Sequence, residues 1–193
     1  MRIISGSARG RRLFSPKNVK IRPTADRIKE SLFNILAVLL GGFDQCRILD
    51  LFAGTGNLGI ESLSRGAAHA VFIDNHKESV NLVSKNLRML DFTGRSRVIE
   101  KEALAALRLL EKTEPPFHLV FIDPPYRQGL AEMALKHLAA SALIDEYSLV
   151  IVEFSSGEDL PRAFDNLKDF DRRIYGDTAI AFFRRTLQEN INN

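Results

Sequence analysis

The sequence predicts an α/β protein built on a mainly parallel, doubly wound sheet. Short apolar runs that suit strands buried on both faces recur along the chain, and segments with the apolar spacing of helices lie between them. This alternation favours parallel strands joined by helical crossovers. The length of 193 residues and the hydrophobic content of 45% suit one domain with a substantial core, with room for a small appendage.

The expected elements run from a short N-terminal hairpin to a longer C-terminal one. "RIISG" and "RRLF" flank the small-residue turn "SGSARG", which predicts a β-hairpin. Thr24 can cap a helix that follows Pro23 and ends at Gly41-Gly42. We then expect buried strands at 47–53, 70–74, 97–101, 119–123 and 148–154, with helices near 58–65, 76–90, 102–112 and 128–140. The tail "FDRRIYGDTAIAFFRR" predicts two antiparallel strands joined at "YGDT", at or near the sheet edge.

Positive charge is concentrated at the N-terminus. The net charge of the chain is +3, yet residues 1 to 30 carry nine Lys or Arg against two acidic residues, a local charge of +7. The remaining 163 residues therefore carry a net charge of −4. A localised basic segment indicates a polyanionic partner, whereas a solvated basic tail is the alternative. The predicted hairpin favours the first interpretation, because it would order the segment.

Several classes of protein are disfavoured by composition. The chain has no apolar run near the ~20 residues of a membrane span, and "MRIISGSARG" does not resemble a secretory signal, so we expect a cytoplasmic protein. Cys46 is the sole cysteine, which rules out an intramolecular disulfide and suits an inert thiol. The four histidines are scattered without ligand spacing, and we therefore expect no metal site.

The stretch "DLFAGTGNLG", residues 50 to 59, follows the first expected strand of the sheet. Gly54, Gly56 and Gly59 match the dinucleotide fingerprint G-x-G-x-x-G, and Asp74 lies 20 residues after Gly54, where an acid can bind ribose hydroxyls. Any adenosine-containing cofactor suits this pattern, so a dehydrogenase remains possible. Asp50 favours S-adenosylmethionine, because its carboxylate would oppose the pyrophosphate of NAD and would attract an ammonium and a sulfonium.

The stretch "VFIDPPYRQG", residues 120 to 129, ends a strand on a carboxylate and two prolines. Pro124 and Pro125 lack the N–H groups that extend a sheet ladder, and Asp123 needs a hydrogen-bond donor next to the apolar run. The Asp123 carboxylate and the Pro124 carbonyl can each accept an N–H of an exocyclic amine, and Tyr126 can stack on its base. A simple turn is the alternative, which the glycine loop 70 residues earlier disfavours.

Together, "DLFAGTG" and "DPPY" resemble the first and fourth motifs of Rossmann-like methyltransferases that modify exocyclic amines of nucleobases. "MRIISGSARGRRL", "RPTADRIKESLFNIL", "DLFAGTGNLGIESLSRGA" and "FIDPPY" resemble, in order, the bacterial RsmD family of 16S rRNA guanine-N2 methyltransferases. The resemblance covers nearly the whole chain and implies a Rossmann-like class I methyltransferase fold. It divides the chain into a basic hairpin arm (1–22), an S-adenosylmethionine-binding methyltransferase domain (23–187) and a tail (188–193).

The resemblance also implies roles for individual residues. The methionine part of the cofactor would be surrounded by Asp50, Phe52, Ala53, Gly54, Gly56 and Gly59. Asp74 would hold the ribose, and Glu102 and Ala103 of "EKEA" match the family's adenine-side motif, in which Asp is more usual than Glu. The catalytic segment would be Asp123, Pro124, Pro125 and Tyr126. From the clustering of charge, we expect RNA to be bound by Arg9, Arg11, Arg12, Arg22 and Arg27.

The expected function is direct transfer of a methyl group from S-adenosylmethionine to a guanine N2 amine, without a covalent enzyme intermediate. By resemblance the substrate is 16S rRNA in a partly assembled small ribosomal subunit, with no membrane and no obligate protein partner. The alternatives are another RNA guanine-N2 or a DNA adenine-N6 methyltransferase, a nucleotide-dependent dehydrogenase, and a non-catalytic RNA-binding module. A DNA enzyme would need a large sequence-reading domain that is not evident here, a dehydrogenase has no use for "DPPY", and a degenerate module would be expected to have lost Asp50 or Asp123.

Overall fold

The computed structural model describes residues 1–16 and 23–186, and the side chains from residue 26 onward within the second range. The predicted RNA contact Arg22, the side chain of the predicted cap Thr24 and the predicted tail at 188–193 lie outside this description. The chain divides into two compact units, Met1–Ala103 and Leu104–Asn193. The first unit includes the described part of the basic arm together with the glycine loop.

The first unit carries a parallel sheet with the order β3-β2-β1. Its elements are α1 (Pro23–Leu40), β1 (Arg47–Asp50), α2 (Asn57–Ser64), β2 (His69–Asp74), α3 (Lys77–Met89), the short 3-10 helix η1 (Thr93–Arg95) and β3 (Ser96–Glu100). Asp50 pairs with Phe72, and Asp74 pairs with Glu100. The strands therefore end at one edge of the sheet, where their terminal carboxylates gather.

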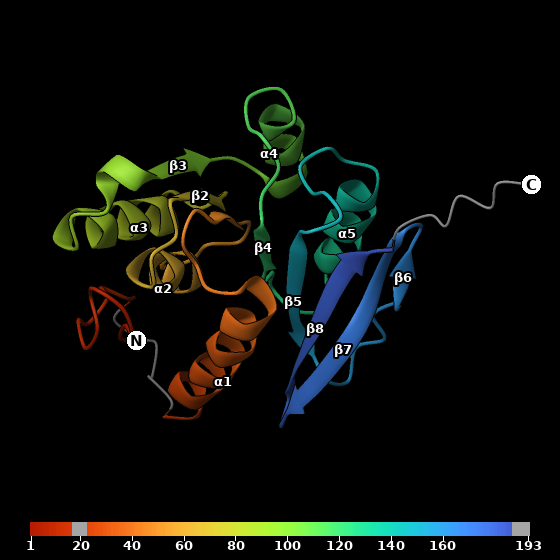
Figure 1. Cartoon of the computed structure of the whole chain (residues 1–193), viewed down its shortest axis with the longest axis horizontal. Helices are drawn as coiled ribbons and strands as arrows, with labels where there is room; N and C mark the ends of the chain where they lie inside the picture. Colours follow the sequence, from red (N-terminus) through yellow and green to blue (C-terminus); the bar gives the residue numbers. More distant parts are fainter. Residues whose placement is uncertain (17–22, 187–193) are drawn as a thin grey trace, which may run out of the picture. The chain divides into compact units, whose positions relative to one another are not determined.

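The second unit combines one parallel pair of strands with an antiparallel extension, in the order β4-β5-β8-β7-β6 (Figure 1). Its elements are α4 (Ala103–Leu110), which begins at the last residue of the first unit, β4 (Leu119–Ile122), α5 (Leu130–Ala139), β5 (Leu149–Ser155), β6 (Ala163–Phe164), β7 (Leu167–Tyr175) and β8 (Thr178–Arg185). The predicted hairpin at "YGDT" is confirmed, and Gly176 at its turn has a φ of 62°.

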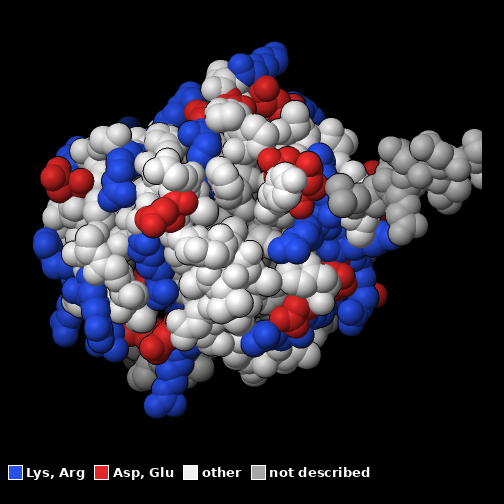
Figure 2. All heavy atoms as spheres, viewed as in Figure 1, with Lys and Arg blue, Asp and Glu red and all other residues white. Residues whose placement is uncertain are grey.

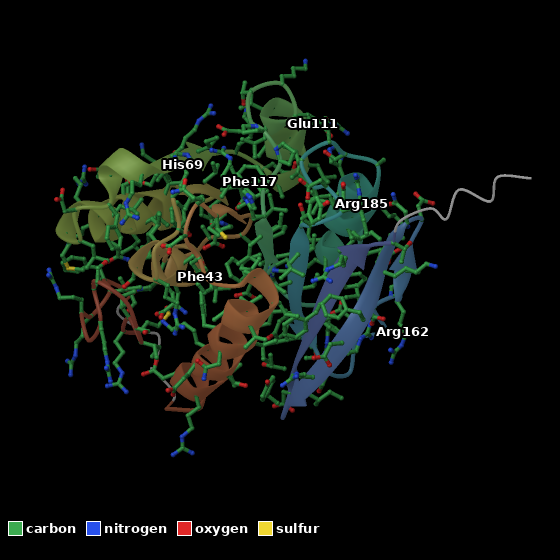
Figure 3. All side chains as sticks on the ribbon, in the orientation of Figure 1. Phe43, His69, Glu111, Phe117, Arg162 and Arg185 are labelled. Atoms are coloured by element: carbon green, nitrogen blue, oxygen red, sulfur yellow. The ribbon has the colours of Figure 1, made fainter. Side chains whose placement is uncertain are left out.

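The core consists of the strands and the apolar faces of the helices. Every residue of β4 is at most 1% exposed, and Phe33 and Phe43 pack with ring centroids 5.6 Å apart (Figure 3). In the second unit, Phe117 is fully buried just before β4. The expectation that the strand at 97–101 is buried on both faces is wrong, because β3 is the outermost strand of its sheet and its residues are only partly buried.

The N-terminal segment, residues 1–16, is ordered but is not a regular hairpin. A single antiparallel bridge joins Arg2 to Arg12, where we expected two short strands. The N–H groups of Ile4 and Ser5 donate instead to the Glu61 carboxylate, at 2.8 and 3.0 Å. The segment keeps hairpin-type bonds of its own, from the Ile3 N–H to the Arg11 carbonyl at 2.9 Å and from the Leu13 N–H to the Met1 carbonyl at 3.1 Å, and it also bonds to α2.

Candidate active site

The glycine loop after β1 is held at both ends by carboxylates. The Gly54 N–H donates to Asp74 Oδ2 at 2.9 Å, and the Gly59 N–H donates to Asp50 Oδ2 at the same distance. Gly54 and Gly56 adopt φ values of 55° and 78°, which favour glycine at the turn. Two acids at strand ends thus fix the path of a loop whose backbone can approach a ligand closely.

Gly59 is required by packing. A Cβ atom there would lie 2.3 Å from the Phe72 ring and 3.1 Å from Asp50 Oδ2. The absence of a side chain lets α2 approach β2 closely, which is the role of the third glycine of the fingerprint.

Asp50 is a buried acid at the carboxyl end of β1, with only 2% of the residue exposed. Burial raises the pKa of Asp50 to about 7; the Gly59 hydrogen bond lowers it, and the nearby Asp74 carboxylate raises it further. A cationic group placed against Asp50 would favour its ionised form. The residue is therefore suited to receive an ammonium.

Asp74 closes the loop against the end of β2. Its Oδ1 accepts the His76 N–H at 2.9 Å, and its side chain is 13% exposed. The backbone carbonyl of Asp74 accepts the Lys101 N–H at 3.0 Å, just before Glu102 and Ala103. Glu102 is exposed, whereas Ala103 is buried at the start of α4.

The structure brings the predicted methionine-side residues together in one loop. Ala53 is buried, and its N–H donates to the Ile73 carbonyl at 2.9 Å, which ties the loop to β2. Phe52 is partly exposed beside it. Of the part of the chain that the structure describes, no group of three or more His, Cys, Asp or Glu could hold a metal ion.

Asn86 joins the N-terminal segment to the glycine loop. Its side chain is fully buried on α3, accepts the Phe14 N–H at 2.7 Å, and donates to the carbonyls of Phe14 and Thr55 at 3.1 and 3.0 Å. The N-terminal segment is therefore a structural neighbour of the loop that carries Gly54 and Gly56.

A buried ion pair makes a second connection of this kind. Glu61 of α2 is fully buried and lies 3.2 Å from Lys29 Nζ and 2.8 Å from Arg65 Nε. Lys29 also donates to the Arg2 carbonyl at 2.7 Å and to Asn57 Oδ1 at 2.8 Å. Burial lowers the pKa of Lys29, while Glu61 raises it. Lys29 is thus a structural residue, although it belongs to the basic N-terminal cluster in sequence.

The described arginines of the predicted RNA surface are exposed. Arg9, Arg11 and Arg12 lie on the N-terminal segment and Arg27 on α1. A cleft of about 590 Å³ separates this segment from α1, lined by Arg2, Ile3, Ile4, Arg9, Gly10, Asp26, Arg27 and Glu30. Lys and Arg side chains lie along the left side of the view in Figure 2, and others lie over its lower right. The cleft combines cations with two carboxylates, and Arg2 is already paired with Asp26 at 3.0 Å.

The "DPPY" segment follows β4 in the second unit. Asp123 is exposed, Pro124 is buried, Pro125 is exposed, and Tyr126 is 41% exposed. Arg127 and Gly129 then adopt φ values of 61° and 67°, which turn the chain into α5. Pro124 is thus the one buried residue of this segment, and it lies between the exposed residues Asp123 and Pro125.

The Tyr126 hydroxyl is anchored on the sheet. It donates to Glu153 Oε1 of β5 at 3.0 Å and lies 3.4 Å from Thr178 Oγ1 of β8. Burial raises the pKa of Tyr126 to about 12; Thr178 lowers it, and Glu153 raises it. Burial also raises the pKa of Glu153, against the effect of the Tyr126 hydrogen bond.

Three polar residues of these sites were missed by sequence reasoning. Glu61, Asn86 and Glu153 each interrupt an apolar helix face or strand, and each is buried or partly buried. A carboxylate next to an apolar run was the signal by which Asp123 was found. It identifies a residue that needs a partner, but the partners of Asn86 lie 72 and 31 residues away in the chain.

Comparisons with known proteins show which family the chain is similar to. Residues 1–184 match the model of a family described as "Conserved hypothetical protein 95". The chain is 36% identical to the putative rRNA methyltransferase YlbH of Bacillus subtilis over 185 residues, which cover 96% of this chain and 99% of that protein. It is also 36% identical to ribosomal RNA small subunit methyltransferase D of Escherichia coli, over 97% of this chain and 91% of the relative.

Solved structures show the same fold. A putative methyltransferase, yhhF of Escherichia coli, superposes with a TM-score of 0.84 at 35% identity, covering 97% of this chain and 99% of that one. A putative methyltransferase complexed with SAH shares the fold alone, with a TM-score of 0.66 at 10% identity over 85% of this chain and 50% of that one. The predicted Rossmann-like methyltransferase fold is therefore confirmed.

Proposed function

The chain belongs to the RsmD family, and from this premise we propose that it transfers a methyl group from S-adenosylmethionine to the N2 amine of a guanine in 16S rRNA. The observation that carries the proposal is the glycine loop held between Asp50 and Asp74. A buried acid beside a close-approach loop suits an adenosine cofactor that bears a cation, and it does not suit a pyrophosphate.

The residues of the first unit fit this cofactor. Asp50 would receive the ammonium, Asp74 the ribose hydroxyls, and Phe52, Ala53, Gly54, Gly56 and Gly59 would surround the methionine part. Glu102 and Ala103 would lie toward the adenine. When bound, the cofactor supplies an electrophilic methyl group on its sulfonium. The loop residues bind and orient, and none of them forms a covalent bond.

The residues of "DPPY" would act on the base. The lone pair of a guanine N2 amine is delocalised into the ring, so the amine is a poor nucleophile until it becomes pyramidal. The Asp123 carboxylate would accept one N–H, and the Pro124 carbonyl would accept the other. Both interactions strengthen as positive charge develops on nitrogen, which lowers the barrier rather than merely improving binding. Pro125 would stiffen the segment, and Tyr126 would stack on the base.

The RNA would be held by the exposed arginines of the N-terminal segment and α1. Arg9 and Arg27 line one cleft, and Arg11 and Arg12 lie on the same segment. Their charges suit the phosphates of an RNA backbone, while Asp26 and Glu30 of the same cleft repel any phosphate placed directly against them. The substrate would be 16S rRNA within a partly assembled small subunit, in the cytoplasm. Within the described ranges, no helix has the length and apolar character that crossing a bilayer requires.

Product analysis tests this proposal directly. The protein is incubated with methyl-labelled S-adenosylmethionine and, separately, small ribosomal subunits, deproteinised 16S rRNA and duplex DNA, and the nucleosides are then analysed. We expect label in N2-methylguanosine from one or both of the RNA substrates. Label in N6-methyladenine from DNA, in another nucleoside, or in none would contradict the proposal.

A further inference from the structure

Tyr126 combines an exposed ring with a fixed hydroxyl. Its loop follows β4, yet its hydroxyl donates to Glu153 Oε1 at 3.0 Å and approaches Thr178 Oγ1 at 3.4 Å. The residue remains 41% exposed although the far end of its side chain is held. A side chain of this kind can present a flat face to a ligand in one fixed orientation.

We propose that Glu153 is a positioning residue that fixes the ring of Tyr126 for the target base, with Thr178 as a second support. The inference rests on the proposed function, since it concerns how the base is held for methyl transfer. It assigns a role to a strand residue outside the "DPPY" segment. Glu153 acts through Tyr126 and need not touch the base itself.

The supports come from the most regular part of the second unit. Glu153 lies on β5 and Thr178 begins β8, and these strands pair antiparallel with Ser155 opposite Thr178. The loop that carries Tyr126 turns at once through Arg127 and Gly129, both with positive φ. Two strand side chains therefore fix a loop side chain, so that its orientation does not depend on the loop alone.

The acceptor of this hydrogen bond is a partly buried carboxyl group. Burial raises the pKa of Glu153, and the hydrogen bond that the Tyr126 hydroxyl donates to Oε1 at 3.0 Å lowers it. A pre-fixed ring loses little further freedom when a base stacks on it, and correct orientation of a reacting group raises turnover. The expected consequence is an effect on kcat rather than on cofactor affinity.

A double-mutant cycle distinguishes positioning from independent structural roles. Tyr126→Phe keeps the ring and removes the hydroxyl, whereas Glu153→Ala removes the acceptor. Each should lower kcat for RNA methylation by about tenfold, with S-adenosylhomocysteine affinity unchanged. The double variant should be no worse than either single variant, because both changes break one interaction. Glu153→Gln keeps an acceptor oxygen and should retain most of the activity.

A spectroscopic measurement tests the contact without activity. The chain has three tyrosines, so ring-carbon NMR of labelled tyrosine resolves them, and Tyr126→Phe assigns the resonance of interest. That resonance should shift in Glu153→Ala. The matched control is Tyr147→Phe, which removes a hydroxyl from a tyrosine that is 75% exposed, and which should change neither kcat nor the Tyr126 resonance.

The outcomes separate this inference from the proposed function. If the wild-type protein methylates RNA while both single variants match it, or if their losses multiply in the double variant, the positioning role is wrong and the function stands. If the wild-type protein methylates no RNA, the proposed function fails and the role of Glu153 in it fails too, and the NMR shift would then report only a structural contact.

Discussion

Asp50 is a carboxyl group whose charge is suppressed by burial, and its titration gives a test at the scale of one residue. Its pKa of about 7 exceeds the ordinary value of 3.8. At a pH between 3.8 and about 7, Asp50 is protonated in the folded protein and ionised in the unfolded chain. The stability of the ligand-free fold therefore falls as the pH rises from 3.8 to about 7. A bound ammonium would offset that cost.

S-adenosylhomocysteine affinity should therefore rise by about tenfold from pH 6 to pH 8, as the ionised fraction of Asp50 grows. Asp50→Asn keeps an acceptor for the Gly59 N–H, and it should bind more weakly with a flatter profile. Calorimetry at several pH values measures both proteins. Parallel profiles in the two would remove Asp50 from contact with the ammonium.

Asp74→Ala should weaken S-adenosylhomocysteine binding by ~1–3 kcal/mol, because the ribose hydroxyls would lose a charged acceptor. The structure adds a second cause, since the Gly54 N–H would also lose its partner. Asp74→Asn keeps one acceptor oxygen and should bind with intermediate affinity. An unchanged dissociation constant in Asp74→Ala would contradict the assignment.

Asp123→Ala should lower turnover by at least ~100-fold, because its carboxylate is assigned to the developing charge on the amine. S-adenosylhomocysteine affinity should stay within a few-fold of the wild-type value, since its partner is the base. Asp159→Ala, which removes an exposed carboxylate from the same unit, is the matched control. A near-normal single-turnover rate in Asp123→Ala would take Asp123 out of the reaction.

At the scale of elements, the sequence pattern predicted the regular helices and strands well and the irregular segments poorly. The helix expected at 76–90 is α3, at Lys77–Met89, because its apolar spacing and its packing agree. The first strand was expected to reach residue 53 but ends at Asp50, since Ala53 bonds to the Ile73 carbonyl as the glycine loop begins. The N-terminal hairpin is irregular, with a single bridge, because the N–H groups of Ile4 and Ser5 donate to Glu61 instead of continuing a ladder.

Docking of the N-terminal segment on α2 depends on Gly6. Its φ is +83°, and a Cβ atom there would lie 1.8 Å from the Ser64 carbonyl oxygen. Gly10 has a nearly equal φ of +81° with nothing within 4 Å of such a Cβ. The two positions thus share the backbone strain of an alanine substitution and differ in the clash alone.

Gly6→Ala should therefore destabilise the protein by ~2 kcal/mol or more and expose the segment to protease, whereas Gly10→Ala should cost about 1 kcal/mol. Denaturant unfolding and limited proteolysis measure the two effects. Equal losses in the two variants would mean that strain, and not docking against Ser64, decides the stability of this segment.

For the molecule as a whole, sequence reasoning singled out the residues that we assign to a ligand more readily than those that support them. Asp50, Gly54 and Asp74 lie within a 25-residue stretch whose spacing carries meaning by itself. Asn86 and Glu153 act through partners far along the chain, and no local sequence pattern predicts which residues those partners are. Charge clustering was likewise ambiguous, because Lys29 belongs to the basic cluster and yet is 4% exposed, bound to Glu61.

The uneven charge of the chain gives a prediction for the whole molecule. Arg9, Arg11 and Arg12 are exposed on a segment that is held mainly through its backbone and through Asn86, so removal of their side chains leaves those contacts in place and loses only the exposed bond from Arg11 Nη2 to the Met89 carbonyl. The triple Ala variant should fold normally, because exposed arginines contribute little to stability. Its S-adenosylhomocysteine affinity should also be unchanged.

RNA or subunit binding by this variant should weaken at least tenfold at moderate salt, and log affinity against log salt should flatten by about one unit per lost phosphate contact. The control replaces Arg108, Lys112 and Lys168, exposed residues of the second unit, by Ala. Both variants lower the net charge from +3 to 0, so general attraction falls equally in the two. Only loss of direct phosphate contacts by the N-terminal arginines makes their salt slopes differ. Equal slopes and affinities in the two variants would mean that the basic segment does not contact RNA. The RNA-binding surface would then have to be sought around Tyr126, Arg127 and the β7–β8 hairpin.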